Sequence, residues 1–139
     1  MFVLDSRLQQ DSLVLGDLAL CRLLLSKDAN YPWFILVPRR AEVSELFQLS
    51  AADQQQLWQE TTRLAEALKG EFAADKMNVA TLGNVVSQLH MHVVVRRRDD
   101  AAWPAPVWGK VPAIEYAPGQ VEAIRQRLVV LLGNDLKEA

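Results

Sequence analysis

The sequence has a single cysteine, no long apolar segment and little net charge, and each of these shortages excludes a class of protein. One cysteine among 139 residues, Cys21, cannot build a disulfide framework or a cysteine-based zinc site. No segment reaches the roughly 18 apolar residues of a membrane-spanning helix, and the N-terminal residues lack the pattern of a secretory signal. We therefore expect a cytoplasmic protein with no membrane partner.

The net charge of −2 gives no basic excess of the kind that coats DNA or RNA, so a polymeric nucleic acid is not the expected partner. Half of the residues are hydrophobic, which is typical of a globular chain. A length of 139 residues suffices for one real core, and no repeat, low-complexity tract or linker interrupts it. We predict a single domain spanning residues 1–139.

Three strands are predicted in the first part of the chain. Two short apolar runs, residues 13–15 and 18–25, are separated by the turn-forming pair Gly16-Asp17, which predicts a hairpin. The aromatic and β-branched run 33–37 ends at Pro38. Because this third run is apolar on both faces, we expect a strand in the middle of a sheet.

Helical spacing predicts two main helices and a short helical turn at 44–48. The first main helix begins after Ser50, which with Asp53 resembles a capping box, and ends at Gly70. The second starts near Pro118 and ends at Gly133. Apolar or small side chains recur at helical spacing in both, as Leu57, Thr61, Leu64 and Leu68 in the first, and as Val121, Ile124, Leu128 and Leu131 or Leu132 in the second.

A second predicted hairpin contains both histidines of the protein. Residues 76–82 and 85–95 read as strands joined by a turn at Gly83-Asn84. Alternation along the second strand would place Leu89, Met91 and Val93 in the core, and would leave three polar side chains together on the other face, Gln88, His90 and His92. Strands without regular helix alternation predict an α+β fold, with two main helices on a mainly antiparallel sheet of about five strands.

Three interpretations of the paired histidines stay open from the residues alone. The rings could be inert surface groups. They could bind a metal, although zinc would need further ligands that the sequence does not place. They could also perform nucleophilic catalysis at phosphorus, since a neutral imidazole can attack without a separate base. In that case Asn78, Asn84 and backbone N–H groups near Gly83 could meet the developing charge.

Residues 83–94 resemble the signature of the histidine triad (HIT) superfamily, which is histidine, apolar, histidine, apolar, histidine, apolar, apolar. The order of the expected elements extends the resemblance over most of residues 12–98, and residues 103–109 resemble a subgroup of bacterial members. The resemblance implies a HIT-like α+β homodimer that acts on nucleotides at the α-phosphate. It also implies a nucleotidyl-histidine intermediate and no metal or other cofactor.

Carried over residue by residue, the resemblance makes His90 the nucleophile and His92 a phosphate contact. Gln88 stands where the family places its first histidine, and Val85 stands where many members place a hydroxyl near the leaving group. Asn78, Gly83 and Asn84 match polar or turn positions around the phosphate. The two departures motivate a rival hypothesis, a nucleotide-binding or scaffold protein with weakened or lost catalysis.

Two further groups of residues have ambiguous patterns. Trp103 and Trp108 lie in a proline-rich loop, where they could stack on a base, close the site from a neighbouring subunit, or pin the loop to the core. The charged run Arg96-Arg97-Arg98 could steer an anion, but we expect a solvated strand exit there. Trp33, Phe34 and Trp58 are expected in the core or in a dimer interface.

Overall fold

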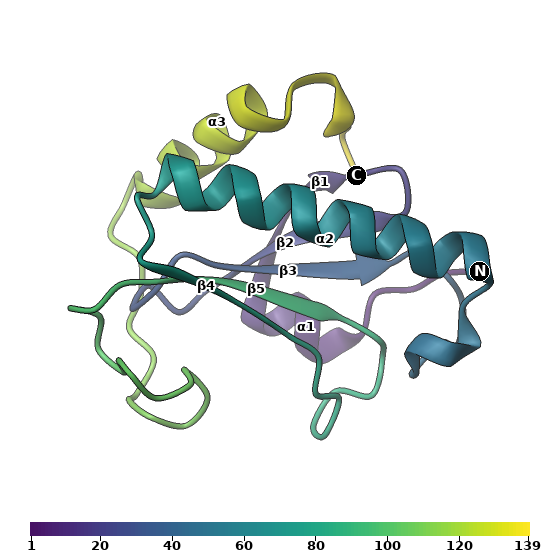
Figure 1. Ribbon diagram of the computed structural model, residues 1–139, viewed down its shortest axis with the longest axis horizontal. Helices are drawn as coiled ribbons and strands as arrows, with labels where there is room; N and C mark the ends of the chain where they lie inside the picture. The colour runs from purple at the N-terminus through teal and green to yellow at the C-terminus, as the bar shows by residue number, and fades with distance from the viewer.

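The computed structural model describes residues 1–139 and contains one five-stranded antiparallel sheet (Figure 1). Its order is β1-β2-β3-β5-β4, so β3 lies in the middle, as the sequence predicted. The α+β prediction is confirmed. The strands are β1 (Ser12–Asp17), β2 (Cys21–Ser26), β3 (Trp33–Pro38), β4 (Lys76–Ala80) and β5 (Met91–Arg96).

Helices cover both faces of the sheet unequally. The two long helices, α2 (Ala51–Glu71) and α3 (Gln120–Leu132), lie over one face, while the short α1 (Ser6–Asp11) lies on the other (Figure 1). Two 3₁₀ turns, Leu46–Gln48 and Gly133–Asp135, complete the elements. No helix combines the length and the apolar character needed to cross a membrane.

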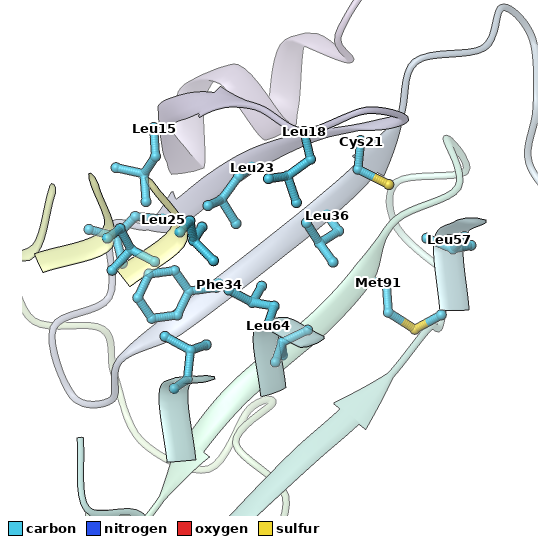
Figure 2. Close-up of a cluster of buried hydrophobic side chains, with 14 of the residues drawn as sticks. Leu15, Leu18, Cys21, Leu23, Leu25, Phe34, Leu36, Leu57, Leu64 and Met91 are labelled. Carbon is cyan, nitrogen blue, oxygen red and sulfur yellow. The ribbon is translucent and has the colours of Figure 1, made fainter. Parts of the chain in front are cut away.

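The main core fills the space between the sheet and the two long helices (Figure 2). Alternate residues of each strand contribute to it, for example Phe34 and Leu36 of β3 and Met91 and Val93 of β5, all of which are buried. Thr61 of α2 is buried at the same layer and satisfies its hydroxyl by donating to the Leu57 carbonyl. The predicted apolar side of the histidine strand is therefore confirmed as core.

The opposite face of the sheet combines smaller apolar clusters with polar groups. The other set of alternate residues points here, including Ile35 of β3 and His92 and Arg96 of β5. Residues of α1 cover one part of this face, and a long loop at 97–115 covers another through Ala102 and Val107. Strand alternation thus separates an apolar layer from a layer that holds the histidines.

The first hairpin turn is displaced from its predicted position. The structure places Gly16-Asp17 inside β1 at a register shift, and the turn falls at residues 18–20. A Cβ at Gly16 would lie 2.6 Å from the Lys137 carbonyl oxygen, so the glycine allows close passage of the C-terminal segment rather than a turn. The true turn is held by Glu60 of α2, whose buried carboxylate accepts from the backbone N–H groups of Leu20 and Cys21.

The second hairpin is confirmed, but its connection is longer than predicted. β4 and β5 pair antiparallel, with Ala80 opposite His92, while residues 81–90 form an irregular loop and the strand begins only at Met91. The predicted strand start at residue 85 is wrong because the loop's groups bond elsewhere. For example, the Leu89 N–H donates to the Val43 carbonyl instead of to a neighbouring strand.

The long helices lie where the sequence predicted them, with small differences at their ends. The Ser50 side chain caps α2 by accepting from the Asp53 N–H at 3.1 Å. That helix continues one residue beyond Gly70. α3 begins after Gly119 rather than at Pro118 and ends before Gly133. The six-residue helix α1 was not predicted. Trp58 of α2, expected in the core or in a dimer interface, is 59% exposed in the single chain and so is not in the core.

Candidate active site

His90 and His92 lie side by side on the sheet face opposite α2 and α3. Their ring centroids are 4.8 Å apart with the planes at 73°, and the two residues are only 5% and 7% exposed. His92 is paired with Ile35 of β3 on one side and Ala80 of β4 on the other, and His90 immediately precedes β5. His92 is therefore held between two neighbouring strands, and His90 lies at the start of the same strand, one residue before its pairing begins.

The backbone around His90 determines which ring nitrogen is free. Its Nδ1 lies 2.6 Å from the carbonyl oxygen of Gln88. A carbonyl oxygen can only accept, so Nδ1 carries a proton, and in the neutral ring the lone pair is then on Nε2. The carbonyl of His90 accepts in turn from the Thr81 hydroxyl at 2.7 Å. The loop before β5 thus orients this imidazole with Nε2 available as a nucleophile.

His92 lies in a different environment, surrounded by aromatic rings. The indole Nε1–H of Trp33 donates to its Nδ1 at 2.9 Å. The Trp108 ring is 5.0 Å away at an interplanar angle of 80°, and it also packs edge-on against Trp33 at 5.6 Å. Burial, together with the neighbouring His90, lowers the pKa of His92 from 6.5 to about 3. The ring is therefore uncharged at neutral pH.

The lowered pKa of His92 predicts how the stability of the fold depends on pH. Between pH 6.5 and about 3, the unfolded chain binds a proton at His92 that the folded chain excludes. Stability from this group is present above pH 6.5 and is lost as pH falls toward 3, with a slope of about 1.4 kcal/mol per pH unit for one proton. Denaturant unfolding of wild type and His92→Gln from pH 7 to 4 should give a shallower pH dependence for the variant, and equal slopes would contradict the prediction.

Arg96 is the centre of the contacts that hold the tryptophan loop. It is 1% exposed, and its guanidinium pairs with the Asp100 carboxylate at 2.8 Å while donating to the Ala105 carbonyl at 2.8 Å. The Trp103 ring lies 5.6 Å from the guanidinium carbon. A solvated exit was the wrong prediction for Arg96, because the loop after β5 folds back over it. Arg98, with a side chain 77% exposed, fits that prediction.

The pKa of Asp100 is lowered to about 2 although burial acts to raise it. Burial is the largest single influence, but it is outweighed by the combined hydrogen bonds from Arg96 and from the backbone N–H groups of Arg97, Ala102 and Trp103. The two tryptophans of this loop contact different groups. Trp103 packs against the guanidinium of the buried ion pair, whereas Trp108 packs against the ring of His92.

The remaining predicted site residues lie on β4 and in the loop that precedes the histidines. Asn78 of β4 lies on the same sheet face, and its Oδ1 accepts from Arg96 at 2.7 Å, which leaves its Nδ2 as the end not held by the arginine. Asn84 and Val85 are exposed in the loop before the histidines, and Gly83 has a φ of 79° there. No hydrogen bond joins these loop residues to the histidines.

The side chain of Gln88 is engaged away from the imidazoles. Its Oε1 accepts from the Asp5 N–H and its Nε2 donates to the Val3 carbonyl, each at 2.8 Å. The amide thus holds the N-terminal segment against the loop, while the backbone carbonyl of Gln88 accepts from His90. A shallow pocket of about 300 Å³ lies beside it, lined by Val3, Asp5, Glu42, Val43, Ser44, Ser87 and Gln88.

Sequence reasoning missed two residues of the site, Trp33 and Thr81. Trp33 lies on β3, whose register with β5 was not readable from the chain, and Thr81 lies in the irregular loop after β4, whose path was not predicted. No three His, Cys, Asp or Glu side chains cluster in a way that could hold a metal ion. A cavity of about 570 Å³ lies apart from the histidines, between Arg39, Glu60 and Arg63.

The chain matches known proteins over nearly its whole length. A family model described as HIT domain matches residues 7–99. A histidine triad protein from Bradyrhizobium japonicum is 45% identical, with 91% of this chain and 95% of that chain covered and a TM-score of 0.90. One from Marinobacter aquaeolei VT8 is 44% identical, with 97% and 98% covered and a TM-score of 0.93. No match was found among curated proteins. The family match and these relatives show that the chain belongs to the histidine triad (HIT) domain family.

Proposed function

We propose that this protein is a nucleotide hydrolase or nucleotidyl transferase in which His90 attacks the α-phosphorus. The observation that carries the proposal is the 2.6 Å contact between His90 Nδ1 and the Gln88 carbonyl. It assigns the lone pair to Nε2 before any substrate arrives, so no separate base is needed. Membership of the HIT family supports a nucleotide as the substrate class.

The proposed reaction has two displacements. In the first, a bond forms between His90 Nε2 and the α-phosphorus, and the bond to the leaving group breaks with its electron pair. In the second, water or another acceptor attacks the same phosphorus and loses its proton to solvent, and the electrons of the phosphorus–nitrogen bond return to Nε2. Asn78 Nδ2 and the backbone N–H groups near Gly83 and Asn84 are the proposed donors to the phosphoryl oxygens.

The departure at Val85 bears on the leaving group. Valine has no proton to donate, and this side chain is 75% exposed. A leaving amine would need protonation as it departs, whereas a phosphate or nucleotide leaving group can depart as an anion. We therefore favour dinucleoside polyphosphates over phosphoramidates as substrates.

The departure at Gln88 leaves the nucleophile in place. In this proposal the first motif position accepts a hydrogen bond from His90 through its backbone carbonyl, which any residue provides. The glutamine side chain instead forms hydrogen bonds with the N-terminal segment. We propose that the chain represents a Gln-x-His-x-His subgroup of the family. Its form would be a cytoplasmic homodimer of single HIT domains that needs no metal or other cofactor.

The experiment is to trap the covalent intermediate. Incubation with diadenosine polyphosphate, or with an adenosine phosphoramidate, is followed by an alkaline quench, since acid cleaves the phosphorus–nitrogen bond. Mass spectrometry should find one adenylyl group on the peptide that contains His90, and none in His90→Ala. Turnover without an adduct and without dependence on His90 would exclude the mechanism.

A nucleotide-binding protein with weakened or lost catalysis is the second candidate, favoured by the missing hydroxyl at Val85. Calorimetry with mononucleotides separates the two proposals. Tight binding, combined with no turnover on either substrate class, would support the binding protein. Turnover that is lost in chelator and restored by zinc would instead support a metal-dependent hydrolase.

A further inference from the structure

We propose that Trp33 is a positioning residue that holds His92 as the tautomer with its proton on Nε2. The effect of Trp33 on catalysis rests on the proposed function, whereas the hydrogen bond between Trp33 and His92 is present without a substrate. Nothing in the sequence pattern pointed to this role, since Trp33 was expected in the core or in an interface. The role depends on what an indole can and cannot do as a hydrogen-bonding group.

An indole N–H donates and never accepts. Trp33 Nε1 lies 2.9 Å from His92 Nδ1, so that nitrogen must present its lone pair to the tryptophan. In a neutral imidazole the proton is then on Nε2. Trp33 is itself fixed, because it occupies β3, packs edge-on against Tyr31 at 6.3 Å and meets Trp108 at 5.6 Å.

The two imidazoles are consequently complementary. A backbone acceptor at Gln88 gives His90 a proton on Nδ1 and a lone pair on Nε2, whereas a donor at Trp33 gives His92 the reverse. The rings lie 4.8 Å apart between centroids. One ring can therefore attack phosphorus while its neighbour donates a hydrogen bond to a phosphoryl oxygen, and neither ring needs to exchange a proton first.

His92 makes this donation as an uncharged group. Its neighbours across the sheet, Ile35 of β3 and Ala80 of β4, do not titrate, and neither do the two tryptophans packed on it. His90 is the one titratable group that faces it, and burial, with a smaller contribution from His90, lowers the pKa of His92 to about 3. Protonation of His92 should therefore not limit activity between pH 5 and 8.

The test is nitrogen-15 NMR of the imidazole rings without substrate. The protein has only two histidines, so the spectrum contains two rings, and His90→Gln assigns them. In wild type at pH 7 we expect His92 Nδ1 to be unprotonated and Nε2 protonated, with the opposite pattern in His90. A protonated Nδ1 on His92 in wild type would overturn the inference without any variant.

Trp33→Phe removes the donor and keeps an aromatic ring, and Trp108→Phe is the matched control because Trp108 contacts His92 without a hydrogen bond. The first variant should mix the tautomers of His92 and lower kcat at least about tenfold, with a smaller change in KM. The second should keep the wild-type tautomer. An unchanged tautomer in folded Trp33→Phe would contradict the proposal.

The NMR result and the trapping result are independent. Correct tautomers without an adduct on His90 would refute the proposed function and leave the role of Trp33 in place. An adduct on His90 with a protonated Nδ1 on His92 would support the proposed function and refute the role of Trp33. A failure of one proposal can therefore be distinguished from a failure of the other.

Discussion

Replacing His90 with asparagine should reduce turnover at least about 10³-fold and eliminate the covalent intermediate. Asparagine keeps a polar side chain and fits within the space of the imidazole, but it has no ring lone pair to attack phosphorus. The loss should appear in kcat, because the nucleophile acts in the chemical step rather than in substrate binding. Steady-state kinetics with the substrate identified by trapping measures the effect.

The matched variant is His92→Asn, at the neighbouring ring. It removes the imidazole Nε2–H that is proposed to donate to the phosphoryl oxygen, and the shorter asparagine amide does not extend to that position, but the lone pair of His90 stays in place. We expect slower turnover with an adduct still detectable at His90. If His90→Asn kept activity within tenfold of wild type, or lost no more than His92→Asn, the assignment of the nucleophile would be wrong.

Features encoded within a short stretch of chain were predictable. The Ser50 cap and the apolar spacing that follows it specify α2 within one residue at its C-terminal end. Period-two alternation likewise separated Met91 and Val93 from the histidines, because a pleated strand must send neighbouring side chains to opposite faces. The side of the sheet on which chemistry is possible followed from the sequence for that reason.

Features set by contacts between distant segments were not predictable. Gly16 looks like a turn residue, yet its role depends on Lys137, which lies at the other end of the sequence. Residues 85–90 have strand composition, yet their hydrogen bonds go to Val43 and to the N-terminal segment. Local propensity was overridden by tertiary hydrogen bonding in each case.

The site residues divide in the same way into local and long-range features. The histidines themselves were identifiable because two imidazoles one residue apart are a local pattern. Trp33 and Arg96 were not, since an indole in a central strand looks apolar and an arginine at a strand end looks solvated. Their roles come from the β3–β5 register and from the folding back of the loop after β5.

Replacing Arg96 with methionine should lower the free energy of unfolding by about 3–5 kcal/mol, because it leaves the Asp100 carboxylate buried without its partner. The side chains of Arg96 and Asp100 are only 2% and 8% exposed, so water cannot replace the lost ion pair without opening the loop. Denaturant unfolding followed by tryptophan fluorescence measures the loss. Arg98→Met, at a side chain 77% exposed, is the control and should change stability by less than about 0.5 kcal/mol.

The consequence for the site separates this prediction from a simple loss of stability. Opening the loop removes Trp108 from His92, which exposes the imidazole to water and raises its pKa toward 6.5. In folded Arg96→Met at low denaturant, NMR titration should therefore show His92 taking up a proton at a higher pH than in wild type. A destabilised variant with an unchanged His92 titration would mean that Arg96 supports the fold without maintaining the environment of the histidines.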